Sequence, residues 1–358
     1  MNEEKEKMKV MHLLQSGKFS GAENVVCQII EMFKNDTDIE MAYCSRDGQI
    51  RDALKEREIK FFPLVKLCMS DVKRVIEEYK PDVIHAHDMN ASFIAALVCG
   101  NIPLISHIHN NAFDSRAISI KSIAYFFAAL KIKHIFWVSE SSFNGYCFHK
   151  FFSSKSSILY NILNINVLYQ KMKIDQNEYS YDIAYVGRLT YPKNPQRLMK
   201  VLKSAVEKYS KLSVAIIGAG DLEQEAIALC KEYGIENNVT FLGFQSNPLK
   251  ILHDSKAMVM TSRWEGTPMC ALEAMALGVP IVSTPVDGLK YLVINGKNGY
   301  LFDDDDQLAN ALISISTNSS LHKRLSQKQI DMSIEYNSVK NYKEEICKAY
   351  GYVRRKDN

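Results

Sequence analysis

Residues 263–280 (RWEGTPMCALEAMALGVP) carry the pattern with the clearest chemical meaning in this sequence. Thr267 suits the N-cap of a helix, Pro268 suits its first position, and Gly278 suits its end. A helix that begins there would direct free backbone N–H groups and the positive end of its dipole toward the preceding strand. The segment therefore predicts a binding site for a phosphate group.

Two carboxylates, Glu265 and Glu273, lie on either side of this predicted helix start. A carboxylate repels a phosphate but accepts hydrogen bonds from hydroxyl groups, so each could bind a sugar or a ribose. In the alternative interpretation, Glu265 caps the helix and Glu273 is a solvated residue on its surface. The spacing is compatible with both interpretations.

Residues 187–194 (GRLTYPKN) form a second loop, between a predicted strand and a helix that Asn194 can cap and Pro195 can begin. Open α/β sheets bind ligands at the carboxyl ends of their strands, which is where Arg188 and Lys193 lie. Arg grips a phosphate with two hydrogen bonds and Lys adds a point charge, so the pair could offset a diphosphate. As isolated residues, the two could equally be solvated surface charges.

Residues 16–23 (SGKFSGAE) form a third and weaker loop, in which Gly17 and Gly21 would let the backbone approach a ligand. Its spacing fits neither G-x-G-x-x-G nor G-x-x-x-x-G-K-[ST], which excludes the dinucleotide and P-loop motifs. Residues 218–221 (GAGD) are interpreted as a turn.

Two histidine pairs, His85 with His87 and His107 with His109, each alternate along a predicted strand and therefore point to one face. Such pairs could seed a metal-dependent hydrolase. The sequence supplies no further ligand set with recognisable spacing, and strand ends at a ligand site explain the histidines without a metal. We therefore expect no metal site, and we interpret the aspartates at 303–306 as caps of a helix at 307–316.

The elements that position these loops follow from an alternation of short Val/Ile-rich runs with segments of helical period. The predicted strands of the first half are residues 9–14, 39–44, 82–86, 103–108 and 134–139. The predicted strands of the second half are residues 182–186, 212–217, 239–242, 257–261 and 280–283. The pattern indicates two doubly wound α/β domains, residues 1–168 and 182–335, with a linker at 169–181 and a C-terminal helix within 336–358. Two such sheets in tandem imply a cleft between them.

Composition excludes several classes of protein. The chain has 358 residues, of which 47% are hydrophobic and 24% charged, which excludes a mainly disordered, collagen-like or coiled-coil chain. The net charge of +3 is too small to indicate a nucleic-acid partner. The eight cysteines lack C-x-x-C spacing, so neither a zinc nor a redox motif is predicted. Without a secretory signal or an apolar run of membrane-spanning length, the protein is expected to be cytoplasmic.

The motifs together resemble the retaining, nucleotide-sugar-dependent glycosyltransferases of the GT-B fold, in the family 4 that includes bacterial lipopolysaccharide, capsule and exopolysaccharide enzymes. The resemblance is strongest at 187–302, where GRLTYPKN, the two glutamates, LEAMALGVPIVST and NGKNGYLF occur in the family's order. The first half contributes SGAE, PDVIHAHD and SHIHN. The resemblance implies two Rossmann-like domains that face a cleft, and a C-terminal helix that crosses back to the first domain.

The resemblance also implies roles for individual residues. Arg188 and Lys193 would bind the donor diphosphate. Glu273 would hold the ribose and Glu265 the donor sugar, and His109 would lie at the reacting sugar. The implied donor-binding set is Gly21, Gly187, Arg188, Lys193, Phe244, Glu265, Gly266, Thr267, Pro268, Met269, Cys270 and Glu273.

His87 and Asn110 are assigned to the acceptor, whereas His107 lies deeper in its strand and is expected to be structural. Two positions depart from the family pattern. Ser20 stands where glycine is usual, and Tyr291 stands where glutamate is frequent. Neither change removes a charge assigned to the reaction, so they affect the expected donor rather than the expected activity.

The implied reaction moves a sugar from a UDP-sugar or GDP-sugar to a hydroxyl of a saccharide or polyprenyl-linked acceptor, with retention and without a metal or other cofactor. A nucleotide-sugar epimerase or hydrolase of the same fold is one alternative, and a non-enzymatic carbohydrate or lipid binder is another. Basic and aromatic residues at 116–155 could rest on an anionic membrane surface, at the inner face of the cytoplasmic membrane. An amphipathic helix packed on the sheet would explain the same residues.

Overall fold

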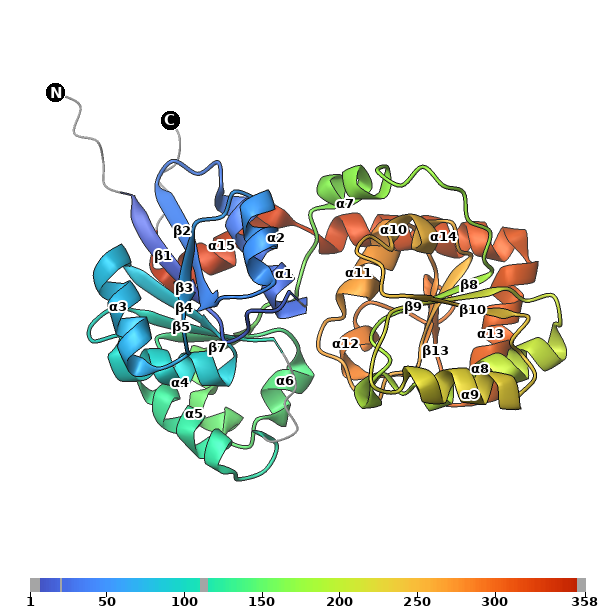
Figure 1. The fold of residues 1–358 in the computed structure, drawn as a ribbon, viewed down its shortest axis with the longest axis horizontal. Helices are drawn as coiled ribbons and strands as arrows, with labels where there is room; N and C mark the ends of the chain where they lie inside the picture. Colours follow the sequence, from blue (N-terminus) through green and yellow to red (C-terminus); the bar gives the residue numbers. More distant parts are fainter. Residues whose placement is uncertain (1–6, 20, 110–114, 353–358) are drawn as a thin grey trace. The chain divides into compact units, whose positions relative to one another are not determined.

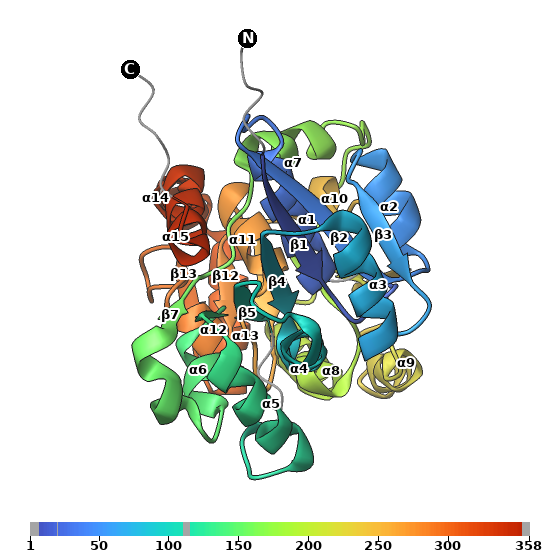
Figure 2. The same cartoon turned by 90° about the vertical axis from the view of Figure 1, so that its left-hand side faces the viewer.

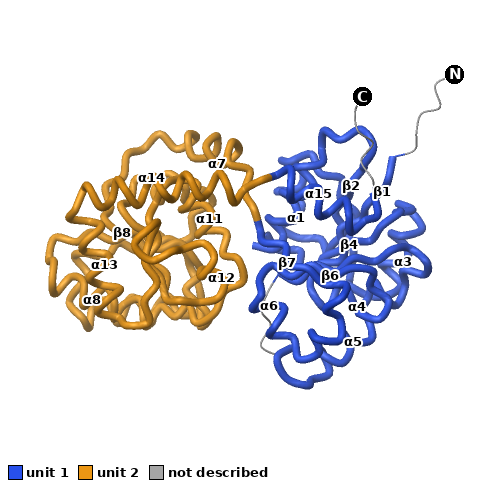
Figure 3. Tube along the Cα trace, turned by 180° about the vertical axis from the view of Figure 1, so that it is seen from behind, with its two compact units in different colours: residues 1–161, 339–358 blue, residues 162–338 orange. Residues whose placement is uncertain are grey.

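The structure is a computed structural model that describes residues 7–19, 21–109 and 115–352. The chain folds into two compact units, which Figure 3 distinguishes by colour. Unit 1 comprises Met1–Asn161 and Val339–Asn358, and unit 2 comprises Ile162–Ser338. Each unit contains one parallel β-sheet between layers of helices (Figure 1), so the doubly wound α/β class is confirmed.

The sheet of unit 1 has seven strands in the order β3-β2-β1-β4-β5-β6-β7, and all neighbouring strands are parallel. The central strands β4 and β5 are buried along their whole length because helices cover both faces. The strands are β1 (Met8–Leu13), β2 (Ile39–Arg46), β3 (Phe61–Leu64), β4 (Val83–His87), β5 (Leu104–Ile108), β6 (His134–Trp137) and β7 (Ser156–Ile158).

The helices of unit 1 cover this sheet on two sides, with α1 and α15 on one face and α3, α4 and α5 on the other (Figures 1 and 2). Apolar side chains at helical spacing bury one face of α1, namely Val25, Val26, Ile29, Ile30 and Phe33. The helices are α1 (Gly21–Phe33), α2 (Ile50–Glu56), α3 (Met69–Tyr79), α4 (Asp88–Val98), α5 (Ile120–Lys131), α6 (Glu140–Gly145), the 3-10 helix η2 (His149–Lys155) and α15 (Val339–Tyr350).

Helix α15 joins unit 1 although it is the last helix of the chain. The hydroxyl of Tyr350 lies 2.8 Å from Nδ1 of His85, and Lys343 forms an ion pair of 2.8 Å with Asp36. Tyr342, Ile346 and Tyr350 of this helix are buried. The position of the helix agrees with the C-terminal helix that the resemblance places on the first domain.

The sheet of unit 2 has six parallel strands in the order β10-β9-β8-β11-β12-β13. The strands are β8 (Ile183–Val186), β9 (Val214–Ile217), β10 (Val239–Gly243), β11 (Ala257–Met260), β12 (Ile281–Ser283) and β13 (Gly299–Leu301). The helices are α7 (Ile165–Met172), the 3-10 helix η3 (Tyr191–Lys193), α8 (Pro195–Lys208), α9 (Glu223–Glu232), α10 (Leu249–His253), α11 (Met269–Ala276), α12 (Asp287–Lys290), α13 (Asp305–Thr317) and α14 (Ser319–Tyr336).

Both sheets reverse their strand order once, between β1 and β4 in unit 1 and between β8 and β11 in unit 2. At such a reversal the two neighbouring loops leave the sheet in opposite directions, and the carboxyl ends of the strands border a crevice that binds ligands in open α/β sheets. The loops at these two edges therefore position the candidate site residues.

The boundary between the units differs from the predicted one. Unit 1 ends at Asn161, and the first four positions of the expected linker at 169–181 belong to α7. Leu168 and Met172 of this helix are buried in unit 2, and the Tyr169 hydroxyl donates to the carbonyl oxygen of Ala276 at 2.9 Å. The polar composition of the segment concealed a short helix that needs only two buried side chains.

Candidate functional site

The loop after β8, residues 187–194, is held against the loop after β9 by its backbone. The N–H of Leu189 donates to the carbonyl of Ala219 at 3.0 Å, and the N–H of Leu222 donates to the carbonyl of Leu189 at 2.9 Å. A Cβ atom at Gly220 would lie 2.2 Å from the Leu189 oxygen, and one at Gly218 would lie 1.9 Å from the Gly187 oxygen. The GAGD segment is therefore more than a turn, because its glycines let the two loops touch.

Gly187 and Leu189, the neighbours of Arg188 in the chain, both form backbone hydrogen bonds, which hold the loop on either side of Arg188. The Arg188 side chain is exposed, and it makes no hydrogen bond or ion pair with the part of the chain that the structure describes. Its guanidinium can therefore receive a phosphate without first breaking a contact to those residues.

Lys193 and Glu265 meet across the reversal of the unit 2 sheet. The Lys193 ammonium donates to Oε1 of Glu265, which also accepts a hydrogen bond of 2.6 Å from the Ser262 hydroxyl. Burial lowers the pKa of Lys193, but the charge of Glu265 and its hydrogen bond outweigh this effect and the net pKa shift is upward. Glu265 is thus not a helix cap, and Lys193 brings a charge that is already paired.

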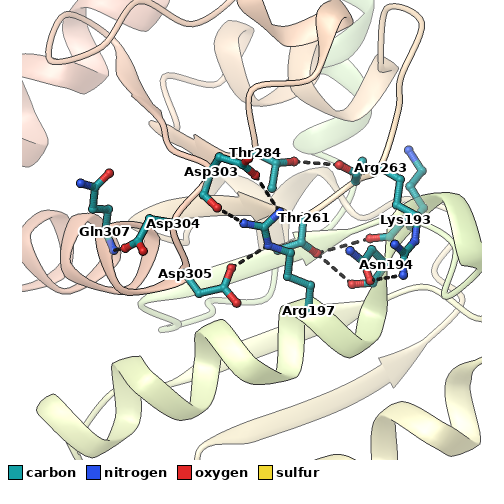
Figure 4. Close-up of polar contacts among 11 residues, drawn as sticks. Lys193, Asn194, Arg197, Thr261, Arg263, Thr284, Asp303, Asp304, Asp305 and Gln307 are labelled. Atoms are coloured by element: carbon teal, nitrogen blue, oxygen red, sulfur yellow. Dashed lines mark hydrogen bonds and ion pairs between the residues drawn. The ribbon is translucent and has the colours of Figure 1, made fainter.

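Asn194 occupies the N-cap position of α8 as predicted, but its side chain makes no capping hydrogen bond. Its backbone is left-handed, with φ of 56°, and its side chain accepts a hydrogen bond of 2.9 Å from Nη2 of Arg263 (Figure 4). The Thr261 hydroxyl donates to the carbonyl of Asn194 at 3.2 Å. These contacts connect the loops after β8 and β11, and Pro195 begins the helix as predicted.

Helix α11 begins at Met269, with Pro268 rather than Thr267 as its N-cap, because Pro268 has extended backbone angles. The N–H groups of Ala271 and Leu272 are the first with an acceptor inside the helix, the Pro268 carbonyl. The N–H groups of Met269 and Cys270 therefore lie at the open end of the helix, as the phosphate-site prediction requires.

The loop that leads to α11 is supported from the side by Gly288 of α12. A Cβ atom at Gly288 would lie 1.4 Å from the carbonyl oxygen of Gly266, so only glycine allows this approach. Thr267 is buried within the same loop. The close contact fixes Gly266 and Glu265 relative to the helix start.

Glu273 lies one turn into α11 and is partly buried rather than fully solvated. Loss of water around its carboxyl group raises the pKa of Glu273 to about 7, and Lys171 opposes the shift only weakly. Its carboxyl group makes no hydrogen bond to the described residues. Burial without a partner favours the interpretation that Glu273 binds ligand hydroxyls, since a polar group in this position gains from a donor.

Phe244 follows β10 in a loop that begins with the left-handed Gly243, and 78% of its surface is exposed. Its ring can therefore stack on an aromatic base. Cys270 is the second residue of α11. Burial raises the pKa of its thiol to about 12, so the thiol is neutral and a poor nucleophile.

Of the aspartates at 303–306, Asp304 caps a helix as predicted, whereas the other three bond to side chains of α8. Asp304 accepts from the backbone N–H of Gln307 at 2.8 Å and caps α13, which begins at Asp305. Arg197 pairs with Asp303 at 3.0 Å and with Asp305 at 2.6 Å (Figure 4). These residues line a cavity of about 680 Å³ beside the loop after β8.

In unit 1, glycines likewise bring two loops into contact where the strand order reverses between β1 and β4. A Cβ atom at Gly17 would lie 2.4 Å from the Asp47 carbonyl, so Gly17 serves the contact of two loops and not the approach to a ligand that we expected. Gly21 begins α1 and faces open space. A pocket of about 600 Å³ lies here, and its lining includes Gln15, Lys18, Arg46, His87 and Asp88.

Five histidines pack together beneath this pocket. His12 of β1 is in register with His85 of β4, and His87 is in register with His107 of β5. His87 lies between His12, at 3.0 Å, and His109, at 2.8 Å, with each distance measured between ring nitrogens. The structure thus brings His87 and His109 together. It also adds His12 to this group of histidines, a residue that lies in no sequence motif and is placed there only by the register of the strands.

Two groups of three among these histidines could hold a metal ion, because their ring nitrogens lie within 4.8 Å of one another. One group is His12, His85 and His87, and the other is His87, His107 and His109. His107 is fully buried, as expected for a structural residue. Asn110 and Ser20, which also carried predictions, lie outside the described residues.

Asp88 anchors the end of this cluster. It has left-handed backbone angles, with φ of 65°, and its carboxylate accepts from the backbone N–H of His109 at 3.0 Å. Burial raises the pKa of Asp88 to about 6. A non-glycine residue in this conformation is strained, and such strain is concentrated at functional sites.

Comparisons with known proteins agree with this architecture. Residues 170–332 match the family described as glycosyl transferases group 1, and residues 19–166 match glycosyltransferase family 4. The chain therefore belongs to the GT-B glycosyltransferases of family 4, which confirms the family and the fold that the resemblance implied.

An Escherichia coli UDP-Gal:alpha-D-GlcNAc-diphosphoundecaprenol alpha-1,3-galactosyltransferase is 26% identical over 352 residues, which cover 88% of this chain and 90% of that protein. An uncharacterized glycosyltransferase of Methanocaldococcus jannaschii is 30% identical over 236 residues, or 60% of this chain and 58% of that protein. The structure of Anabaena HepE in complex with UDP and glucose superposes with a TM-score of 0.83 at 21% identity, over 96% of this chain and 99% of that chain.

Proposed function

We propose that the protein transfers a hexose from a nucleoside diphosphate sugar, a UDP-sugar or a GDP-sugar, to a hydroxyl of a saccharide acceptor, with retention at the anomeric carbon. The observation that carries this proposal is the grouping of Arg188, the Lys193 and Glu265 pair, the open start of α11 and Glu273 on neighbouring loops of one sheet edge. The combination matches a diphosphate followed by two sets of hydroxyls.

The chemistry follows from charge. As the bond between the sugar and the diphosphate breaks, negative charge grows on the diphosphate, and Arg188, Lys193 and the N–H groups at the start of α11 stabilise it. The acceptor proton passes to the departing phosphate oxygen. Glu265 is held by Lys193 and Ser262, which supports a sugar-binding role over that of a covalent nucleophile. These groups supply the positive charge, so we propose that no metal is required.

A panel of UDP-, GDP- and ADP-sugars tests the donor, since a true donor raises the midpoint of thermal unfolding. The transfer assay then uses that donor with lipid-linked and free saccharides, with and without EDTA. Transfer that persists in EDTA supports the metal-independent reaction, and transfer abolished by EDTA and restored by a divalent ion contradicts it. Donor consumption without acceptor would indicate the epimerase or hydrolase, and binding without turnover would indicate a carbohydrate binder.

For the acceptor we propose a lipid-linked saccharide of cell-surface polysaccharide biosynthesis that enters the pocket of unit 1 lined by His87. The support is that one relative acts on a diphosphoundecaprenol-linked sugar and that a Salmonella typhimurium relative, 24% identical over 302 residues, is a lipopolysaccharide 1,6-galactosyltransferase. Lys18 and Arg46 in the pocket suit the phosphates of such a lipid.

No helix in the described ranges combines the length and apolarity needed to cross a bilayer. Helix α5 nevertheless exposes an apolar strip at helical spacing, with 90% of Ile120, 62% of Phe127 and 60% of Leu130 accessible. Lys131 at the end of α5 and Lys150 in η2 are exposed. We propose that this strip rests on the anionic inner face of the cytoplasmic membrane.

Flotation with vesicles that contain anionic lipid tests this contact. The variant Ile120→Asp/Phe127→Asp should lose vesicle binding, whereas Ile174→Asp/Ile334→Asp, which changes exposed isoleucines of unit 2, should keep it. Equal binding by both variants, or none by the parent protein, would overturn the proposal.

A further inference from the structure

Three histidines of unit 1 form a continuous chain of ring contacts that ends on a methionine. Nδ1 of His12 lies 3.0 Å from Nε2 of His87, and Nδ1 of His87 lies 2.8 Å from Nε2 of His109. At the other end, Nε2 of His12 lies 3.4 Å from Sδ of Met41. Each contact is a hydrogen bond whose direction depends on which ring nitrogen carries the hydrogen.

Burial determines the protonation state of the three rings. It lowers the pKa of His12 to about 3, with a smaller effect of His109, and it lowers the pKa of His109 to about 3. Burial and the neighbouring histidines lower the pKa of His87 well below its ordinary value. Near pH 7 each ring is therefore neutral, with one N–H and one bare nitrogen.

Met41 decides the direction of the chain. A thioether sulfur accepts a weak hydrogen bond but has no hydrogen to donate, so Nε2 of His12 carries the hydrogen and Nδ1 of His12 is bare. His87 then donates from Nε2 to His12, and its own Nδ1 accepts from Nε2 of His109. The chain thus leaves Nδ1 of His109 bare, and among the described residues this buried atom has no hydrogen-bond partner.

The opposite direction is unfavourable at both ends. The lone pair of His12 Nε2 would face the lone pairs of the Met41 sulfur. At the other end, Nδ1 of His109 would carry a buried hydrogen that no acceptor among the described residues receives. A bare Nδ1, in contrast, can accept a hydrogen from a hydroxyl group that arrives with a ligand.

The short contacts also argue against a metal ion between these rings. Nitrogens that ligate a tetrahedral zinc ion at about 2.05 Å are about 3.3 Å apart. The nitrogen pairs observed here, at 3.0 Å and 2.8 Å, are closer and are occupied by their mutual hydrogen bonds. Metal binding is accordingly treated below as an outcome that would contradict the chain.

We propose that His12 and His87 are positioning residues that hold His109 as its Nε2–H tautomer, so that Nδ1 of His109 accepts a hydrogen bond from a sugar hydroxyl. The role given to His109 rests on the proposed glycosyltransferase function, whereas its tautomer does not. Asp88 binds the backbone N–H of His109 at 3.0 Å, so the residue is fixed at its backbone and at its ring.

Long-range proton–nitrogen NMR spectra of the full-length protein, labelled with nitrogen-15 in histidine, distinguish the two tautomers directly. The expected result is that His12, His87 and His109 all carry hydrogen on Nε2 and have a bare Nδ1. A spectrum in which His109 carries its hydrogen on Nδ1 would overturn the proposal. The same holds for a stoichiometric Zn²⁺ titration that shifts all three rings together.

Substitution of the terminal acceptor tests the cause of this tautomer. Met41→Leu keeps the apolar volume but removes the sulfur, so His109 should appear as a mixture of both tautomers. Met11→Leu changes a buried methionine of β1 that packs in the hydrophobic core of unit 1, and it should leave the tautomer unchanged. An unchanged His109 spectrum in Met41→Leu would show that the sulfur does not set the direction.

The functional part of the proposal is measured separately, with the donor found above. His12→Phe should lower kcat about tenfold or more with little change in the donor KM, because His109 still contacts the sugar but in mixed tautomers. An unchanged kcat in a His12→Phe protein whose His109 tautomer is mixed would refute the catalytic consequence. If the parent protein transfers no sugar, the proposed function fails while the NMR result still stands.

Discussion

Arg188 and Lys193 belong to the same loop, yet they could meet a diphosphate in different ways. Lys193 already donates to Glu265, so a bound phosphate receives only its remaining N–H groups. The Arg188 side chain is exposed and makes no hydrogen bond or ion pair with the described residues, so its whole guanidinium is available. At the scale of single residues, Arg188 is therefore the stronger contributor to charge that develops in the reaction.

Arg188→Ala should lower the transfer rate about 10²–10³-fold, which is the usual effect of removing one group that stabilises developing charge. The midpoint of thermal unfolding should stay nearly constant because the Arg188 side chain makes no hydrogen bond or ion pair with the described residues, and its backbone hydrogen bonds remain in the variant. Arg74→Ala, which removes an exposed arginine of α3, is the matched control and should retain full activity. A parent-like rate in Arg188→Ala would remove this residue from the site.

Glu273 predicts a pH dependence of nucleotide binding. Its pKa of about 7 lies above the ordinary value of 4.5, so the folded apo protein favours the protonated form. The contribution of Glu273 to the folding stability of the apo protein is therefore fully present below about pH 4.5, and it is lost as the pH rises through 7. Ribose hydroxyls bind better to the carboxylate, so nucleotide affinity should rise about tenfold from pH 6 to pH 8.

Calorimetric titration of the donor nucleotide at both pH values measures this change. Glu273→Gln should bind weakly at both pH values because it cannot ionise. Glu232→Gln, at an exposed position of α9, should keep the tenfold rise. A rise of the same size in Glu273→Gln would assign the titration to another group.

At the scale of secondary structure elements, the crossing of the loops after β8 and β9 depends on two glycines. Gly220→Ala would place a methyl group 2.2 Å from the Leu189 carbonyl and so displace the loop that carries Arg188. We expect a loss of about 1–3 kcal/mol in the free energy of unfolding, together with at least tenfold weaker nucleotide binding.

Gly234→Ala is the comparison variant, since Gly234 is left-handed, with φ of 68°, but faces open space. It should lose stability through backbone strain and keep nucleotide binding. Equal binding by the two variants, measured by thermal shift with nucleotide, would show that loop contact and ligand binding are not coupled.

The strands that the sequence did not reveal are β3, β7 and β13. All three are short strands at the edge of a sheet, and their residues, FFPL, SSI and GYL, lack the Val/Ile-rich runs of the strands inside the sheet. Central parallel strands are buried on both faces and so require continuous apolar sequence, whereas an edge strand needs only one neighbour. The ten predicted strands include the central strands of both units for this reason.

At the scale of the whole molecule, the buried histidines give the two units different responses to acid. Burial lowers the pKa values of His12, His85, His87, His107 and His109 below the ordinary 6.5. A histidine with a lowered pKa in the folded state binds a proton more weakly there than in the unfolded state. The folded state is therefore most stable above pH 6.5 and loses stability as the pH falls. His12 and His109, whose pKa values are lowered to about 3, should each cost about 2 kcal/mol at pH 5.

Hydrogen exchange from pH 7 to pH 5, corrected for the intrinsic rate, should therefore show loss of protection in β1, β4 and β5 before β8 and β11. His107→Phe removes one titrating group and should reduce the difference. Loss of protection first in unit 2 would contradict the assignment of the acid-sensitive groups.

The sequence determined the local features of this protein. Its periodicity predicted most strands and helices, and the residues around GRLTYPKN and RWEGTPMCALEAMALGVP predicted anion-binding loops at strand ends. Such features depend on neighbours a few residues away, through backbone propensity and helix capping, so they are readable without a fold.

Only the tertiary structure decided how distant residues combine. Strand order and parallel register bring His12 to His87, 75 positions away, and Lys193 to Glu265, 72 positions away. They also set Gly220 against the backbone of Leu189. Such contacts depend on packing between elements that the sequence separates, and they turn a loop of basic residues and a row of histidines into sites with fixed charge and hydrogen-bond direction.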